Sequence, residues 1–200
     1  MYRIVKRILS ILCSVISIIV LSPLFIIISL VVKISSKGSV FFIHERIGFQ
    51  GKKFKLIKFR TMVDNAEDMI ASFNPEQKKE WEENFKLKYD PRITKIGKFL
   101  RKTSLDELPQ LINILKGDMS FVGPRPIVED ELSWYGDNKE KLLSVKPGLT
   151  GWWAVNGRSD VPYPERCDLE LYYVDHVSFG FDFLILLKTL GAIIRKDGAR

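Results

Sequence analysis

Two acids stand directly before a leucine and a proline in Thr103-Ser104-Leu105-Asp106-Glu107-Leu108-Pro109-Gln110, the stretch that decides how the centre of this chain folds. Proline fixes its own φ and disfavours the helical region for the preceding residue, so Pro109 predicts the first position of a new helix. Apolar residues recur at helical spacing and predict its buried face: Leu108, Leu111, Ile112 and Leu115. Asp106 and Glu107 are therefore expected at the mouth of this helix. Free backbone N–H groups there stabilise anions, which makes it a good place to handle a phosphate.

A structural explanation of the two acids is also open. Ser104-x-x-Glu107 fits a capping box, in which the Ser and Glu side chains satisfy backbone N–H groups at a helix start. Taken alone, these four residues favour the capping box over a phosphate site. Further along, Pro124-Arg125-Pro126 would present an arginine at little entropic cost, because each proline is rigid. On its own, that tripeptide is more typical of a structural turn.

Composition and charge limit the number of domains and the kinds of partner that this protein can have. A chain of 200 residues that is 46% hydrophobic can bury one moderate core but has no room for two large domains. The net charge of +7 is uneven, since residues 1–40 hold five Lys or Arg and no acid, whereas residues 63–90 hold eight acids and four bases. The basic part suits anionic lipid head groups, nucleotide diphosphates or nucleic acid.

The few cysteines and histidines exclude several chemistries. Cys13 and Cys167 are too few for a disulfide framework and indicate a reducing cytosol. With His44 and His176 as the only histidines in the sequence, a zinc site is not expected. No nucleophile-elbow pattern supports a Ser-His-Asp triad.

The N-terminal segment indicates a membrane association. Residues 8–32 form an uncharged run of 25 residues, about 37 Å of helix at ~1.5 Å per residue, against a bilayer core of roughly 30 Å. The run is too long for a secretory signal, and no cleavage site follows it. Basic residues flank both ends, so a single span would translocate cations or place the basic domain outside, and both go against the positive-inside rule. Ser22-Pro23 lies near the middle, where proline kinks a helix and the Ser hydroxyl can satisfy the carbonyl left free.

We therefore predict a re-entrant helix-break-helix over residues 1–37 that enters and leaves the same leaflet. A Pro-kinked spanning helix is the alternative. Residues 38–200 would form the second, larger domain.

Strands and short helices are expected after the membrane segment. Residues 40–43 are all apolar, and residues 54–59 are mostly apolar, with a Gly-containing turn between the two stretches. This pattern predicts a β-hairpin with a longer loop. Lys58 and Arg60, two apart on a strand, would face the same side and could frame a phosphate. Solvated charges on an edge strand are the alternative. Residues 63–90 predict an acidic helical insertion of one or two helices around Asn74-Pro75, and residues 96–102 a short basic helix or turn that leads into the two acids.

Three stretches carry a resemblance to a known family: Lys58-Phe59-Arg60-Thr61-Met62, the run Leu105-Asp106-Glu107-Leu108-Pro109-Gln110-Leu111, and Lys116-Gly117-Asp118-Met119-Ser120-Phe121-Val122-Gly123-Pro124-Arg125-Pro126. Together they resemble the bacterial sugar transferases, the monotopic phosphoglycosyl transferases that start glycan assembly on polyprenol phosphate. The resemblance covers nearly the whole chain, through Lys188. The fold it implies is α+β and mainly helical, with the re-entrant membrane segment, a small β-hairpin and a compact cytoplasmic catalytic domain with interfacial amphipathic helices.

The same resemblance implies a reaction and a set of site residues. A sugar-1-phosphate would pass from a UDP-sugar to undecaprenyl phosphate, with UMP leaving, as the first membrane step of exopolysaccharide, O-antigen or glycoprotein glycan assembly. Asp106 would attack the β-phosphate to give an aspartyl-phosphosugar, and Glu107 with Asp106 would hold Mg²⁺. The residues implied to bind substrate are Lys58, Arg60, Arg101, Arg125 and Arg158. The implied location is the cytoplasmic face of the bacterial inner membrane.

Two positions depart from the family pattern. His44 stands where the family usually has Gln, and surface or interfacial packing is expected for it. Ala154 also replaces a usual Gln, which puts substrate specificity or rate in doubt. The adjacent Trp152 and Trp153 suit either stacking on a base or a membrane interface, with the interface favoured. Residues 179–194 predict an amphipathic helix lying on the bilayer, with a core helix as the alternative.

Two rival functions remain. One is a membrane-tethered module that binds nucleic acid or anionic lipid, which the basic first 62 residues permit but which leaves the two acids unexplained. We expect membrane lipids, and no nucleic acid, as partners. The other keeps the enzyme but has polyprenol phosphate attack the UDP-sugar directly, with the acids only holding metal. The sequence leaves the sugar open, with a lean to glucose or galactose from residues 63–95, and leaves a homodimer open.

Overall fold

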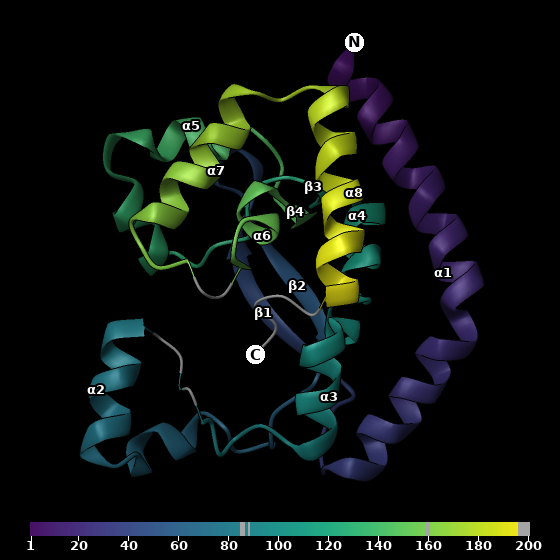
Figure 1. The fold of residues 1–200 in the computed structure, drawn as a ribbon. Coiled ribbons are helices and arrows are strands. Elements are labelled where there is room, and N and C mark those ends of the chain that lie inside the picture. The colour runs from purple at the N-terminus through teal and green to yellow at the C-terminus, as the bar shows by residue number, and fades with distance from the viewer. Residues whose placement is uncertain (85–86, 88, 159–160, 196–200) are drawn as a thin grey trace.

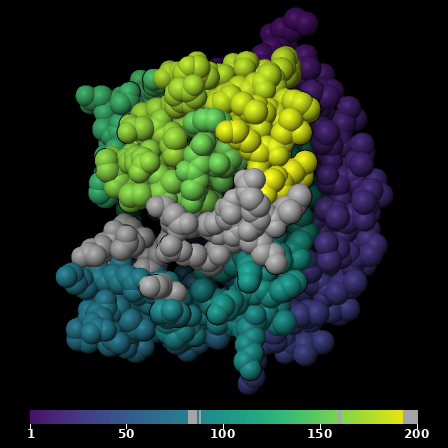
Figure 2. All heavy atoms as spheres, in the orientation of Figure 1, coloured from purple at the N-terminus to yellow at the C-terminus, as the bar shows by residue number. Residues whose placement is uncertain are grey.

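The computed structural model describes residues 1–84, 87, 89–158 and 161–195 (Figure 1). The described part is mainly helical, with small two-stranded sheets, as the sequence predicts. A long N-terminal helix runs down one side of the molecule, and the rest of the chain packs along it (Figure 1). The surface is hollowed between the segment around residues 70–80 and the part that holds residues 150–175 (Figure 2).

The elements have the following bounds. The helices are α1 (Tyr2–Ser35), α2 (Pro75–Asn84), α3 (Lys95–Thr103), α4 (Gln110–Lys116), α5 (Lys139–Leu143), α6 (Trp152–Val155), α7 (Glu165–Asp175) and α8 (Phe179–Arg195). The strands are β1 (Phe41–Ile47), β2 (Lys53–Phe59), β3 (Ser120–Val122) and β4 (Gly148–Thr150). Short 3₁₀ helices are η1 (Phe49–Gly51), η2 (Asp68–Ser72), η3 (Leu105–Glu107) and η4 (Asp130–Asn138).

Helix α1 differs from the prediction for residues 1–37. We expected two helices separated by a break at Ser22-Pro23, and the structure has one helix that contains Pro23. The Ser22 hydroxyl donates a hydrogen bond of 2.8 Å to the carbonyl of Ile19, which is the carbonyl that lacks a partner because Pro23 has no N–H. The helix therefore continues through the proline, and it is bowed with its concave side towards the rest of the chain (Figure 1).

The two faces of α1 have different surroundings. Ser10, Ser14, Ile28 and Val32 are buried against the rest of the chain. The outer face exposes large apolar side chains along its whole length: Ile8, Leu12, Ile16, Ile19, Val20, Ile26, Ile27, Leu30 and Ile34. By length and composition α1 could cross a membrane. A long helix with so much exposed apolar surface fits a membrane association.

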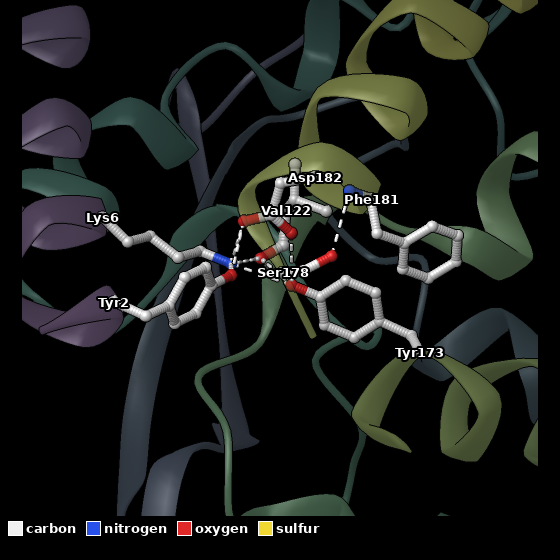
Figure 3. A network of polar contacts seen from close by, with 7 residues as sticks. All are labelled: Tyr2, Lys6, Val122, Tyr173, Ser178, Phe181 and Asp182. Atoms are coloured by element: carbon white, nitrogen blue, oxygen red, sulfur yellow. Dashed lines mark hydrogen bonds and ion pairs between the residues drawn. The ribbon is translucent and has the colours of Figure 1, made fainter. Parts of the chain in front are cut away.

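A polar clasp holds the start of α1 to the C-terminal half of the chain (Figure 3). Lys6 Nζ lies 2.8 Å from Asp182 Oδ2 on α8 and donates to the Val122 carbonyl at the end of β3 at 2.9 Å. Tyr2 donates to Asp182 at 2.6 Å, and Tyr173 donates to the other Asp182 oxygen at 2.7 Å. Since Asp182 is only 8% exposed, the paired lysine offsets the cost of burying its charge.

The predicted hairpin is confirmed. Strands β1 and β2 pair antiparallel, with Ile43 opposite Ile57, and η1 makes the turn through Gly51 at φ 75°. Helix α4 covers β2 and completes its hydrogen bonding: the Asn113 amide accepts from the Ile57 N–H at 3.0 Å and donates to the Lys55 carbonyl at 2.7 Å. This fixes the strand against the helix that follows the two acids.

Within residues 63–90, the described part contains the 3₁₀ helix η2 and the helix α2, which agrees with the predicted one or two helices around Asn74-Pro75. Asn74 caps α2, because its side chain accepts from the Gln77 N–H and the Gln77 side chain accepts in return. Arg92 attaches the insertion to the body. It is 4% exposed, pairs with Asp90 at 2.7 Å, and its guanidinium lies over the Trp81 ring at 4.5 Å.

Helix α8 has one face in the core and one outside. Ile185 is fully buried and packs against Val122 and Tyr173. Phe183, Leu187 and Leu190 are exposed at 63%, 51% and 61%. The core-helix alternative for residues 179–194 is therefore confirmed for one face, whereas a position on the bilayer stays a prediction for the uncovered apolar face.

Candidate active site

A tight turn between α3 and α4 carries the two acids. Helix α3 ends at Thr103 and is capped by Ser104, which has a left-handed φ of 58°, and the following 3₁₀ turn η3 contains Asp106 and Glu107. The Glu107 N–H donates to the Ser104 carbonyl at 3.2 Å and closes the turn. Helix α4 starts at Gln110, one residue after the predicted position, with Pro109 as its cap residue. The acids thus lie directly before a helix, as expected.

The capping-box explanation is wrong. The Ser104 side chain makes no cap hydrogen bond. Its hydroxyl instead accepts from Arg158 Nη2 at 2.8 Å, and the Glu107 carboxylate pairs with Lys58, with 2.8 Å between Nζ and Oε1. The side chains of Lys58 and Glu107 are each 28% exposed, so the pair can be reached from solvent. Both side chains of the supposed box are therefore engaged in the site.

The two neighbouring acids have opposite pKa shifts. Burial raises the pKa of Asp106 to about 6, and the negative charge of Glu107 adds to this, while Lys58 and Arg101 oppose it. Burial also acts to raise the pKa of Glu107, but Lys58, Arg158 and Arg125 outweigh it and the pKa of Glu107 is lowered. Glu107 is thus held in its charged form, whereas the carboxylate of Asp106 is the more basic of the two. Environments that separate the pKa values of two carboxyl groups in this way are typical of catalytic sites.

Arg101, near the end of α3, interacts electrostatically with Asp106, and its predicted phosphate contact stays a prediction. Its Nε donates to Thr61 Oγ1 at 3.0 Å, and its charge lowers the pKa of Asp106. Burial lowers the pKa of Arg101 itself, and Asp106 offsets part of that shift. The guanidinium is thus fixed to the end of the hairpin next to the acids.

Arg125 is presented by a clamped backbone. The Pro124 carbonyl accepts from the Gly148 N–H at 2.8 Å, and the Pro126 carbonyl accepts from Arg46 Nη1 at 3.2 Å. Parallel strands β3 and β4 meet here through glycines, because a Cβ on Gly148 would clash with the backbone of Gly123. The Arg125 guanidinium lies over the Trp153 ring at 5.5 Å and lowers the pKa of Glu107. Pro-Arg-Pro is therefore an irregular segment, held by backbone hydrogen bonds, whose arginine acts on the charge of Glu107.

Arg60 is the predicted site residue that the structure places elsewhere. It is buried, donates to the Ser36 carbonyl at 3.0 Å and pairs with Asp64 at 3.3 Å. Strand β2 ends at Phe59, so the alternation that would put Arg60 on the side of Lys58 does not extend to it. Arg60 ties the end of α1 to the hairpin instead.

The paired tryptophans have different neighbours. Trp152 packs against Phe181 at 4.9 Å, and Lys188 lies over its ring. Trp153 contacts Arg125 and Arg166, at 5.5 and 4.9 Å. His44 is an exposed residue on β1 beside Phe42, and partial desolvation of its ring, together with the positive charge of Arg46, lowers its pKa.

Sequence reasoning missed a buried acid close to Arg125. Glu170 on α7 is 1% exposed and accepts a 2.5 Å hydrogen bond from Tyr135. Burial raises its pKa to about 7, against the opposing effects of Tyr135, Arg125 and Arg166. The only sequence signal is the spacing of Arg166 and Glu170, four residues apart on one helix face.

Comparison with known proteins decides the family. The family model described as "Bacterial sugar transferase" matches residues 1–196. The chain belongs to the bacterial sugar transferase family. This sugar transferase is 48% identical over 201 residues to the "Undecaprenyl-phosphate galactose phosphotransferase" of Salmonella typhimurium. The match covers 98% of this chain and 42% of that relative.

Two further relatives show the range of lengths. "Exopolysaccharide production protein ExoY" of Sinorhizobium fredii is 46% identical over 197 residues, 97% of this chain and 87% of that protein. "UDP-galactose-lipid carrier transferase" of Erwinia amylovora is 48% identical over 165 residues, 81% of this chain and 35% of that protein. The sugar transferase described here thus spans less than half the length of two of these relatives and most of the third.

Proposed function

We propose that the chain transfers a sugar-1-phosphate from a UDP-sugar to polyprenol phosphate, with release of UMP. The observation that carries the proposal is the pair Asp106 and Glu107, whose pKa values are moved apart inside a group of cations. These cations are Lys58, Arg101, Arg125 and Arg158. Phosphoryl transfer depends on positioning and on neutralising charge, and such a site supplies both. The printed names of the relatives, which mention undecaprenyl phosphate, galactose and a lipid carrier, support the choice of substrates.

In the proposed first step, an Asp106 carboxylate oxygen attacks the β-phosphorus of the donor. A P–O bond to Asp106 forms, and the bond from this phosphorus to the oxygen bridging the two phosphates breaks, so the electron pair leaves with UMP. In the second step, a phosphate oxygen of polyprenol phosphate attacks the same phosphorus and Asp106 is released. The lowered pKa of Glu107 keeps it charged throughout, while Arg101 and Lys58 stabilise the ionised form of Asp106.

The two carboxylates also fit a magnesium ion. Mg²⁺ is usually held by one or two carboxylates together with substrate phosphates, and adjacent Asp106 and Glu107 offer such a set. Among the described residues there is no larger cluster of metal-binding side chains, so the substrate phosphates would have to complete the coordination. When bound, the ion would neutralise phosphate charge.

We further propose that α1 dips into the cytoplasmic leaflet of the bacterial inner membrane and returns, with the catalytic domain on the cytoplasmic face. Both ends of α1 are attached to one body. Near its start, Arg7 donates to the carbonyls of Ile114 and Leu115 at the end of α4, and near its end Val32 packs against Phe59. A helix held to the same domain at both ends cannot leave that domain on one side of a bilayer and its N-terminus on the other. The exposed apolar faces of α1 and α8 would contact lipid.

The test is UMP release from UDP-galactose and UDP-glucose by the membrane-embedded protein, with undecaprenyl phosphate and Mg²⁺ present. Asp106→Asn should reduce turnover by at least about 10³-fold, because the nucleophile is lost, while the protein stays folded in the membrane. Asp137→Asn, which makes the same change at an exposed acid on η4 outside the proposed site, is the matched control and should keep full activity. An active Asp106→Asn protein would refute the nucleophile assignment.

A further inference from the structure

A column of alternating cations and rings leads away from the acid pair. The guanidinium carbon of Arg125 lies 5.5 Å from the centre of the Trp153 ring, and that of Arg166 lies 4.9 Å from the same ring. Arg166 is also 5.0 Å from the Tyr163 ring, which stacks on Trp134 at 5.2 Å with an interplanar angle of 16°. One indole thus contacts two guanidinium groups, and the first of these acts on Glu107.

The hydrogen bonds among the described residues do not account for how these guanidinium groups are held. Within the described residues, the Nε atoms of Arg125 and Arg166 are buried without a hydrogen-bond partner. Arg166, 3% exposed, makes a long hydrogen bond of 3.4 Å from Nη2 to the Val161 carbonyl. The ring contacts are therefore the close contacts that fix the planes of both groups, and such contacts strengthen when water is excluded.

A buried anion offsets the repulsion between the two arginines. Glu170 lies on α7 one turn after Arg166, and both Arg125 and Arg166 stabilise its charged form. Tyr135 donates to one of its oxygens at 2.5 Å, and the other oxygen has no partner among the described residues. Glu170 is fully ionised only above about pH 7, and in that form it provides the counter-charge for the two cations that share one indole.

We propose that Trp153 and Arg166 are positioning residues that hold the guanidinium of Arg125 towards the acid pair, with Glu170 balancing their charge. The proposal rests on the function proposed above, in which Arg125 binds a donor phosphate. The hydrogen bonds of the Pro124 and Pro126 carbonyls fix the backbone position of Arg125, and the Trp153 ring fixes the position of its guanidinium group. Guanidinium placement matters because a phosphate contact is directional, with paired N–H groups facing paired oxygens.

The first test is a double-mutant cycle on the donor kcat/KM. Trp153→Leu should lower it about five- to thirty-fold, the range expected for a desolvated cation–ring contact, and Trp153→Phe, which keeps a ring, should restore at least half of the loss on a logarithmic scale. If Trp153 acts through Arg125, adding Trp153→Leu to Arg125→Lys should cost no more than about twofold further. Trp152→Leu, at the neighbouring position, removes contacts with Phe181 instead. Its fold-loss in kcat/KM should multiply with that of Arg125→Lys in the double variant. Multiplying effects for Trp153→Leu would overturn the proposal.

A second measurement decides the proposal without any activity. In ¹⁵N-arginine-labelled protein in micelles, the Nε–Hε signal of Arg125 can be assigned by its loss in Arg125→Lys. Its order parameter should fall clearly in Trp153→Leu and in Arg166→Met, and stay unchanged in Trp152→Leu. An unchanged Arg125 signal in Trp153→Leu would overturn the proposal. Inactivity of the unaltered protein with every donor would contradict the proposed function alone, because this order parameter would still report on Arg125.

Discussion

Two carboxyl groups that are adjacent in the sequence can have different environments and different pKa values. Asp106 and Glu107 share one 3₁₀ turn, yet the turn buries Asp106 and directs Glu107 to Lys58. The pKa values of two side chains in one short turn are therefore shifted in opposite directions, that of Asp106 up and that of Glu107 down. This separation would allow one acid to attack and the other to hold positive charge.

Glu170 gives a prediction for stability against pH. Its pKa rises from an ordinary 4.5 to about 7 on folding, so between these values the folded state keeps a proton that the unfolded state has lost. The stability from this group is full below about pH 4.5 and is lost as pH rises to about 7, on the order of 3 kcal/mol in total. Glu170→Gln should remove this slope. Unfolding in detergent at pH 5 and 7 should show a larger drop for the unaltered protein than for the variant, and parallel curves would contradict the assignment.

Single residues were the hardest to predict from sequence. Lys58, Arg101, Arg125 and Arg158 all act on the acid pair, but Arg60 does not, because the strand ends one residue before it. The position where a strand stops depends on its tertiary contacts, which no local pattern records. Glu170 left no motif because its burial depends on packing between α7 and η4.

At the scale of elements, one buried side chain joins strand to helix. Asn113 is fully buried and completes the hydrogen bonds of Ile57 and Lys55 on β2, the strand that carries Lys58. Asn113→Leu should lower the free energy of unfolding by about 2–4 kcal/mol, because two buried backbone groups lose their partners. Thermal unfolding measures the change. Asn138→Leu, at an exposed position without a side-chain cap bond, should stay within about 0.5 kcal/mol, and an equal loss in both variants would contradict the role of Asn113.

The presence of helices and strands was easier to predict from the sequence than the points where they are interrupted. The hairpin, α3 and the helices of the acidic insertion follow from turn residues and apolar spacing. The predicted break in α1 was wrong because Ser22 satisfies the Ile19 carbonyl, so the proline bends the helix without ending it. The predicted core face of α4 was partly wrong, since Asn113 and Ile114 are more deeply buried than Ile112 and Leu115. A polar residue such as Asn113 carries no hydrophobic signal.

At the scale of the whole molecule, attachment of α1 at both ends predicts its topology. A tag on either terminus should be reached by protease or labelling reagent only after the cytoplasmic side is opened, because the clasp of Lys6 and Asp182 keeps the N-terminus with the domain. Intact cells and inverted vesicles compare the two sides. A tag on the N-terminus that is labelled from outside intact cells would contradict a re-entrant helix. A spanning α1 would also require the clasp to be open in the membrane.

The covalent intermediate is the central claim, and intact-protein and peptide mass spectrometry test it most directly. The protein is incubated with UDP-galactose or UDP-glucose and Mg²⁺, without lipid acceptor. We predict a hexose-phosphate adduct on the peptide that contains Asp106, with UMP released and no adduct in Asp106→Asn. Turnover with undecaprenyl phosphate but no adduct without it would contradict the covalent route and leave Asp106 and Glu107 as metal ligands for direct transfer.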